Sequence, residues 1–448
     1  MSSTAIELVA PIEPATSRRA AAAAAASADA APRDDDAILL ASREADAAVP
    51  DGGYGWVIVL CGAVMLWWAT GTAYAWGVVQ AALVEEGLAG PAVLSFVGSL
   101  SASFVSSLAI VNARLMRSLG PQKTAVLGMG LLGGSMVLSG FAVQSVGGLF
   151  CTVGVLMGSG ISLCFIVAST IPAQYFRTKR GIANGLIFAG GGWGAAAISF
   201  SLDALIHKLG PAWAYRVLGL VTLVTGLPAA WAMKERSSLG TPSFVEWRLF
   251  KNVTFTLVFF SGVIGTFPLF VAPFFIPLYT KALGFSSGAG AALVAGFSIS
   301  SAVGRILTGF LSDRIGALNA LFLSNALTAL SMLAIWPAST TLVPLVVFVL
   351  LNGASNGGFF STMPTVVSNV FGSARVGVAL SMIVTGWIGG YLMGSPIAGY
   401  LLEAYGGADA GLQAYRPAMF YAGSLALASS VMVLAARVRQ TGKLLAVL

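Results

Sequence analysis

Apolar stretches of about 20 residues recur along the chain from Gly55 onward, and short polar segments separate them. A helix of about 20 residues spans the roughly 30 Å hydrocarbon core of a bilayer, so each stretch predicts one transmembrane helix. Six are expected at 55–84, 92–113, 122–143, 147–171, 180–203 and 211–232. Six more are expected at 251–281, 287–311, 317–337, 341–366, 374–400 and 415–438. The pattern predicts an all-α membrane protein with twelve transmembrane helices in two six-helix pseudo-repeats.

The ends and the middle of the chain depart from this pattern. Residues 1–50 are rich in Ala, Ser and Pro, carry several acids and lack the apolar core of a secretory signal peptide. We expect a disordered cytosolic tail there. It is followed by an N-terminal bundle over 51–232, a cytosolic linker over 233–250, a C-terminal bundle over 251–438 and a cytosolic tail over 439–448.

Composition agrees with a surface that faces lipid. Only 9% of the residues are charged and 57% are hydrophobic, whereas soluble domains carry about 25% charged residues. The 54 glycines allow membrane helices to approach one another closely. A single histidine, His207, and three cysteines in apolar runs argue against a metal site, a disulfide framework or a catalytic triad. We therefore expect no enzyme activity and no cofactor.

Basic residues alternate between the two sides of the predicted bundle. Positive charge marks the cytosolic side of a membrane protein, so the alternation predicts a multi-pass protein with both termini in the cytosol. The plasma membrane is the default expectation for its location. The net charge of +7 does not form one basic stripe, which argues against nucleic acid as a partner and leaves the lipid bilayer and a small molecule. With this orientation, the basic residues of the outer segments are Lys208, Arg216, Lys281 and Arg416.

The two halves resemble each other. Gly158–Gly194 and Gly353–Gly389 both contain a glycine-rich helix, a short basic loop and a second glycine-rich helix. Together with six helices on each side of the linker, this similarity favours duplicated halves. A site at their interface, opened alternately to either side, is expected.

Three motifs carry a resemblance to a known family. The run from Asp51 to Trp56, Asp-Gly-Gly-Tyr-Gly-Trp, resembles the signature that opens the monocarboxylate transporter family. Tyr175–Gly185, continuing to Gly194, resembles that family's second signature, and Gly309–Gly316 resembles the loop motif of the major facilitator superfamily. The resemblance runs to the last helix and is closest to fungal monocarboxylate-permease-like members. It implies the major facilitator fold and transport of a small organic anion.

The first motif also has a physical interpretation. Asp51 is expected to stabilise the start of helix 1, where a carboxylate meets unpaired N–H groups and the positive end of the helix dipole. Gly53 permits the tight turn beside it. Trp56 is expected to be an interfacial aromatic residue, and substrate contact is the alternative for this motif.

The other two motifs indicate gating rather than binding. The basic loop that includes Arg180 most simply stays in the cytosol, and Gly181 opens a glycine-rich helix that is expected to pack closely. Asp313, beside Arg314, lies where its carboxylate can pair with cationic loops or cap a helix end. These residues predict a cytosolic latch that breaks when the inner side opens.

Arg305 lies midway along the predicted helix 8. A charged side chain at the bilayer centre costs at least about 2.5–3.5 kcal/mol on insertion scales, so something must compensate it. A guanidinium matches a carboxylate in a bidentate fork, which favours an anchor for a substrate carboxylate. The alternative is a structural arginine bonded to backbone carbonyls or extended toward the inner face.

The resemblance implies that Arg305 binds substrate, because the family has a substrate-binding arginine at this position. Animal members place an aspartate one turn earlier, where this chain has Ser301, and a lysine in helix 1, which is absent from Thr72–Gln80. These departures put the animal scheme of proton coupling in doubt. A proton is instead expected on Asp203, on Glu403 or on the substrate itself.

Other polar residues of the apolar helices are candidates for the cavity wall, although such groups also join helices to one another. Asn352 and Asn356 are four residues apart and share one face of a helix. Packing or lipid contact is expected of Phe267, Phe270 and Phe274. The substrate-binding candidates besides Arg305 are Tyr74, Asn184, Ser301, Asn352 and Asn356.

The sequence therefore predicts a secondary transporter of a small organic anion, in particular a monocarboxylate, with or without a proton. A carrier of a larger or neutral metabolite such as riboflavin is the first alternative. A nutrient receptor that binds without transporting is the second. The identity of the cargo, the direction of transport, the coupling ion, the oligomeric state and any accessory subunit stay open.

Overall fold

The computed structural model describes residue 49 and residues 51–89, 91–236, 245–372, 376–407 and 411–441. The predicted N-terminal tail, the middle of the linker and most of the predicted C-terminal tail lie outside the described residues. Within these described ranges, eleven helices are long and apolar enough to cross a membrane, and they become twelve when the pair α4 and α5, bent by 57°, counts as one span. The prediction of an all-α membrane protein is confirmed.

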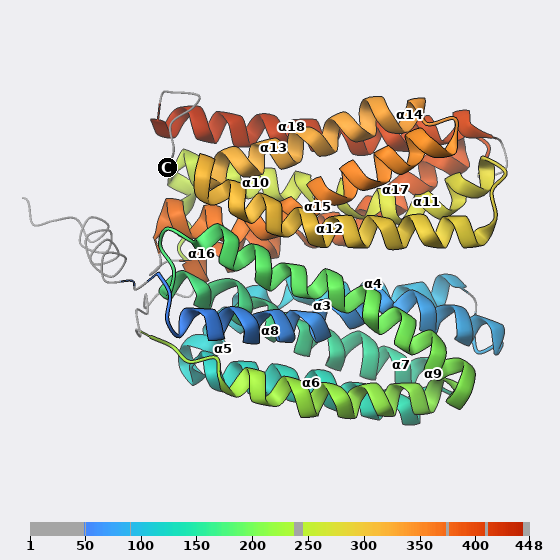
Figure 1. Cartoon of the computed structure of the whole chain (residues 1–448), viewed down its shortest axis with the longest axis horizontal. Helices are drawn as coiled ribbons and strands as arrows, with labels where there is room; N and C mark the ends of the chain where they lie inside the picture. Colours follow the sequence, from blue (N-terminus) through green and yellow to red (C-terminus); the bar gives the residue numbers. More distant parts are fainter. Residues whose placement is uncertain are drawn as a thin grey trace, which may run out of the picture.

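The first half of the chain forms one bundle of helices (Figure 1). Its α-helices are α3 (Gly55–Glu85), α4 (Pro91–Ser107), α5 (Ala109–Leu119), α6 (Pro121–Ala142), α7 (Val146–Leu149), α8 (Gly158–Thr170) and α9 (Arg180–Trp231). A π-helix, η1 (Phe150–Met157), joins α7 to α8, and a 3-10 helix, η2 (Ile171–Gln174), extends the same span beyond α8.

The second half forms a second bundle beside the first (Figure 1). Its α-helices are α10 (Val253–Gly265), α11 (Val271–Ala282), α12 (Ser287–Ile315), α13 (Ala317–Leu330), α14 (Trp336–Ala338), α15 (Leu342–Phe371), α16 (Val376–Gly386), α17 (Ile388–Ala404) and α18 (Arg416–Thr441). The shorter segments are η3 (Trp247–Lys251), η4 (Pro268–Phe270), η5 (Ser331–Ile335) and η7 (Leu412–Tyr415).

The described chain begins and ends at the same end of the molecule (Figure 1). We call this the terminus end. Several helices continue farther toward it than the apolar pattern predicts: α5 runs to Leu119 rather than 113, and α12 runs to Ile315 rather than 311. Helical hydrogen bonding satisfies the backbone in lipid and in water alike, so a helix outlasts its apolar run when long basic side chains reach the interface.

Helix α9 covers two predicted spans without a loop. Gly210, with φ 77° and ψ 164°, is the non-helical residue inside it, and the chain reverses there. Glycine adopts this positive φ without the clash that a Cβ atom would cause. The predicted gap of several residues between 203 and 211 is therefore wrong, because one residue makes the turn.

Helix α9 also joins the two bundles. On one face, a Cβ atom on Gly190 or Gly194 would collide with the backbone of Ala63 or Trp67 in α3. On another face, a Cβ atom on Gly185 would collide with the backbone carbonyl of Arg305 in α12. Small residues permit this close approach of helix backbones in lipid, where packing rather than water exclusion holds helices together. We call these contacts of α9 the glycine seam.

We expect Gly190→Ala to lower the stability of the protein, because the added methyl group meets backbone atoms of α3 that cannot rotate away. Overpacking of this kind costs about 1–3 kcal/mol, which a lower melting temperature of the detergent-solubilised protein should report. Gly130→Ala is the matched control, since no atom lies within 4 Å of its added Cβ. Equal melting temperatures for the two variants would contradict the close contact at the seam.

Candidate functional site

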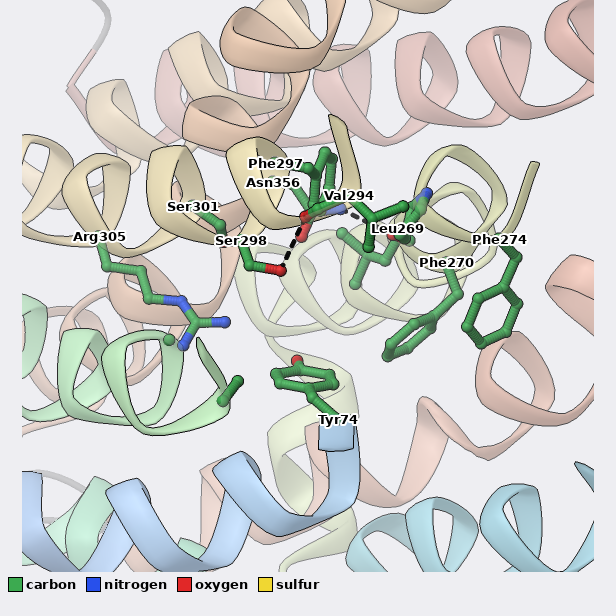
Figure 2. Close-up of a pocket in the computed structure, with 13 residues that line it drawn as sticks. Tyr74, Leu269, Phe270, Phe274, Val294, Phe297, Ser298, Ser301, Arg305 and Asn356 are labelled. Atoms are coloured by element: carbon green, nitrogen blue, oxygen red, sulfur yellow. Dashed lines mark hydrogen bonds between the residues drawn. The ribbon is translucent and has the colours of Figure 1, made fainter. Parts of the chain in front are cut away.

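A cavity of about 140 Å³ lies at the interface between the two bundles. Tyr74 of α3 and Gly192 and Ala195 of α9 form its wall on one side, and the second bundle forms the rest (Figure 2). The cavity adjoins the glycine seam, because Gly192 of α9 packs on Ala302 of α12 and also lines the cavity. The second bundle contributes Leu269, Phe270, Pro273, Phe274, Val294, Phe297, Ser298, Ser301, Arg305 and Asn356.

A smaller cavity of about 60 Å³ adjoins the first. Three residues line both cavities, namely Tyr74, Phe270 and Arg305, so the guanidinium stands at their junction. The remaining wall is almost entirely apolar, and α4 and α8 of the first bundle contribute to it. Its other residues are Thr70, Ala73, Ala102, Val105, Ile161, Phe165, Phe188, Phe360 and Tyr391.

Arg305 is 4% exposed and lies about 15 Å from the end of α12, by the helical rise of 1.5 Å per residue. Its Nη1 donates a hydrogen bond to the backbone carbonyl of Phe188 at 2.7 Å, across the interface between the bundles. Its guanidinium carbon lies 5.6 Å from the centroid of the Phe360 ring. Within the described part of the chain Nε has no hydrogen-bond partner. The guanidinium is thus partly fixed by a backbone carbonyl, and its Nε–H remains available to donate a hydrogen bond to a ligand.

Asn356 lines the larger cavity, but its amide nitrogen is already engaged. Its Nδ2 donates to the backbone carbonyl of Leu269 at 2.7 Å (Figure 2). That carbonyl would normally accept from the residue four positions later, which is Pro273 and has no N–H. Asn356 therefore compensates for a proline and holds the break between α10 and α11 in place. The break itself is occupied by the 3-10 segment η4.

The other predicted substrate contacts divide between the cavity and its surroundings. Tyr74 and Ser301 line the larger cavity with Arg305. Asn352 instead donates to the Ser331 hydroxyl at 2.7 Å inside the second bundle. Asn184 donates to the Thr365 hydroxyl at 2.8 Å and so joins the two bundles. Neither asparagine is among the residues that line the two cavities.

Neither predicted proton carrier is among the described residues that line the two cavities. Glu403 is exposed near the last residue of α17, at the opposite end of its span from the first residue, Val376. Asp203 follows the span Arg180–Leu202, and its side chain lies outside the described residues. The lining of the two cavities, as far as the structure describes it, contains one guanidinium and no carboxylate.

Asp313 ties the bundles together at the terminus end. Its two carboxylate oxygens accept hydrogen bonds from the backbone N–H groups of Gly181 and Ile182, at 2.6 and 2.8 Å. These are among the unpaired amides of the first turn of α9, where the helix dipole also favours an anion. Of the two predicted roles, capping of a helix end is the one observed. Arg314 is exposed, with its guanidinium carbon 4.3 Å from the centroid of the Phe310 ring.

Arg180 is buried between the two bundles and is not a free loop residue, while the cytosolic position of its loop stays a prediction. It is 3% exposed, and its Nε and Nη2 donate to the backbone carbonyls of Phe176 and Ala173 at 2.6 and 3.1 Å. Its Nη1 lies 3.3 Å from the Ser368 carbonyl and 3.3 Å from Oδ1 of Asn369 in the other bundle. The guanidinium thus satisfies carbonyls at the ends of two helices, which are orphaned where a helix stops.

Asp51 does not cap its own helix, contrary to the prediction. The first amides of α3 bond within the turn instead, with Gly55 N donating to Gly52 O at 3.1 Å, and Gly53 has the positive φ of 60° that this turn needs. The Asp51 carboxylate accepts from the backbone N–H groups of Arg177 and Thr178, at 2.5 and 2.8 Å, and from the Thr178 hydroxyl at 3.0 Å. Burial acts to raise the pKa of Asp51, but these donors outweigh it and hold the pKa below its ordinary value of 3.8.

Two aromatic residues that the sequence did not place at the site belong to its wall. Phe270 and Phe274, expected to pack or face lipid, line the larger cavity. The prolines on either side of Phe270 were the available signal, because a broken helix turns side chains toward an interior that a straight helix would not reach. Trp56 is 41% exposed and meets the Phe176 ring edge-on at 5.1 Å, in keeping with an interfacial residue.

Comparisons with known proteins agree with this architecture. The Major Facilitator Superfamily model matches residues 56–296 and 258–445. The aspyridones efflux protein apdF of Emericella nidulans is 27% identical over 373 residues, covering 80% of this chain and 74% of the relative. Monocarboxylate transporter 13 of Rattus norvegicus is 26% identical over 389 residues, covering 85% of this chain and 88% of the relative.

A solved structure is also similar to the chain. The bacterial homologue of the iron transporter ferroportin, in its outward-facing state, matches with a TM-score of 0.69 at 12% identity. The match covers 86% of this chain and 100% of that chain. At this identity the likeness concerns the fold alone.

We expect Asp313→Ala to open the terminus end, because it removes two charge-assisted hydrogen bonds worth about 1.5–3 kcal/mol each. Spin labels at Lys123 and Arg439, both exposed at the terminus end, should then report a new population at longer distance. Asp313→Asn keeps one acceptor oxygen and should give a smaller shift. An unchanged distance distribution in Asp313→Ala would mean that the carboxylate does not hold the bundles together.

Asp51→Asn should lower the melting temperature near neutral pH. A carboxyl whose pKa is lowered on folding contributes stability above its unfolded pKa and loses it as pH falls through the folded value. The difference from the unmodified protein should therefore be constant from about pH 5 upward and shrink only below 3.8, the ordinary pKa. A difference that already disappears between about pH 5 and 7 would contradict the lowered pKa.

Proposed function

The chain belongs to the Major Facilitator Superfamily, and on that premise we propose that it carries a small organic anion, in particular a monocarboxylate, by alternating access. Family membership makes the protein a multi-pass membrane transporter and not an enzyme. The proposal concerns the cargo, the binding residue and the route.

The incompletely paired guanidinium of Arg305 is the observation that carries the proposal. A cation held out of water is costly unless an anion or several acceptors compensate it. The Phe188 carbonyl supplies one acceptor, while Nε remains without a partner among the described residues. A bound carboxylate would supply the missing charge and accept from the guanidinium fork in a bidentate geometry. Ser301, one turn away on the same cavity wall, adds a hydroxyl.

Alternating access supplies the route for that anion. The contacts of Arg180, Asn184 and Asp313 join the bundles at and near the terminus end, while the cavity lies beyond the seam. Release toward the terminus end would break these contacts and separate α9 from α12 there. We place this end in the cytosol on the basis of the loop charges, and the protein in the plasma membrane.

The motif resemblance and the rat monocarboxylate transporter 13 support a monocarboxylate as cargo. The name of the Emericella nidulans relative, an efflux protein for aspyridones, supports a second candidate, export of a larger organic metabolite. Aromatic side chains in both cavities suit either cargo. Proton coupling through Asp203 or Glu403 stays a prediction, and a proton carried on the substrate's own carboxyl group is the simpler scheme for this cavity.

Arg305→Gln should raise the KM for monocarboxylate uptake about tenfold to hundredfold, because a charge-assisted hydrogen bond contributes about 1.5–3 kcal/mol. Uptake by purified protein in liposomes, with and without an inward proton gradient, measures this. Arg416→Gln is the control, since Arg416 is an exposed arginine that lines neither cavity. Unchanged carboxylate uptake in Arg305→Gln, or uptake of riboflavin but of no carboxylate, would overturn the proposal.

A further inference from the structure

We infer that the cargo is an elongated monoanion with an aromatic ring, of the arylalkanoate type, rather than a two- or three-carbon acid. The inference rests on the proposed function, because it uses Arg305 as the site of the anion. It adds a second subsite, for the ring, in the larger cavity.

The wall that α12 contributes to the larger cavity is long. Arg305, Ser301, Ser298 and Val294 follow one another at intervals of four, three and four residues, so they form one stripe along the helix, and all four line the larger cavity. Eleven residues of helix span about 16 Å. A short acid bound at Arg305 would cover about one turn of the stripe, 5.4 Å in pitch, and leave the rest of the wall without contact.

The larger cavity measures about 140 Å³. An apolar cavity of about 150 Å³, made by truncating a core leucine in a well-studied lysozyme, binds benzene. The space beyond Arg305 is thus about the size of one aromatic ring, and a second fused ring would exceed it.

The wall opposite α12 is aromatic. Phe270 lies 5.9 Å from Phe274 between ring centroids, with 32° between the planes, and 6.5 Å from Tyr74. Figure 2 places Arg305 at one end of the cavity, these two phenylalanines at the other and Tyr74 beside the space between them. Aromatic pairs prefer offset or edge-to-face contacts at 4.5–7 Å, so a ligand ring can join this cluster in a favourable geometry.

The hydroxyl groups of the α12 stripe fix the orientation of the cargo. The Ser301 hydroxyl makes no hydrogen bond within the described chain, whereas Ser298 already donates to the Val294 carbonyl at 3.1 Å. Free polar capacity is therefore concentrated at the Arg305 end of the stripe. A carboxylate there and a ring one turn farther along the stripe are about 5.4 Å apart. Two or three methylene groups bridge that separation.

The first experiment compares cargoes in the unmodified protein. Liposomes containing the full chain are loaded with unlabelled acid, and exchange of labelled acetate, lactate, phenylacetate, 3-phenylpropionate and 3-phenylpropionamide is measured. We expect the KM for 3-phenylpropionate to be at least about tenfold below that for lactate, because burial of a ring adds about 1.5–3 kcal/mol. The amide should not be carried.

The second experiment fills the ring subsite. Val294→Phe should raise the ratio of the KM for 3-phenylpropionate to the KM for acetate by about tenfold or more, since a bulky side chain then occupies the space of the ring. Val303→Phe is the matched control on the same helix, because Val303 is 40% exposed and lines neither cavity. That control should leave the ratio unchanged.

The outcomes distinguish failure of the ring subsite from failure of the anion site. Lactate or acetate carried with an equal or lower KM than 3-phenylpropionate would overturn the ring subsite and leave the anion site standing. An unchanged KM ratio in Val294→Phe would also overturn it. Transport of the neutral amide as readily as the acid, unaffected by Arg305→Gln, would overturn the proposed anion function itself.

Discussion

The glycine seam of α9 is the constraint on which the remaining architecture depends. Helix α9 approaches the backbone of α3 on one face and the backbone of α12 on another, at distances that leave no room for a Cβ atom at Gly185, Gly190 or Gly194. Lipid offers no hydrophobic drive between helices, so close packing of backbones must hold them together. One helix therefore fixes the position of both bundles, and the cavity occupies the region where α9 and α12 diverge.

Arg305 follows from the same geometry. Its backbone carbonyl touches the seam at Gly185, while its side chain returns to α9 and donates to the Phe188 carbonyl. The guanidinium is thus anchored on the helix that joins the bundles, at the junction of the two cavities. An anion bound to it would contact both halves of the transporter at once. Binding and the relative position of the halves are coupled wherever a ligand has different contacts in two states.

The apolar runs were sufficient to predict the number of spans, and the cost of a charge in lipid was sufficient to single out Arg305. Sequence reasoning failed where a side chain serves a partner that is remote along the chain. Asp51 binds a loop beyond position 170, and Arg180 binds the end of α15. The direction of the Phe274 side chain depends on a helix break. The prolines in the sequence indicate that the helix breaks, but they do not give the angle of the break. Periodicity reports the face of a helix, and it does not report which neighbour that face meets.

The turn at Gly210 has a mechanical consequence. A connection made by a single residue keeps the ends of the two arms of α9 together, so they cannot separate or slide past one another at that end of the molecule. The first arm carries the contacts with α12, and the second packs along α6, where Gly219 touches the backbone of Gly133. A displacement of the first arm at Asp313 is therefore transmitted through Gly210 to the second arm, which packs on α6. The two arms of α9 thus form one helical hairpin whose turn, at Gly210, lies at the end opposite the termini.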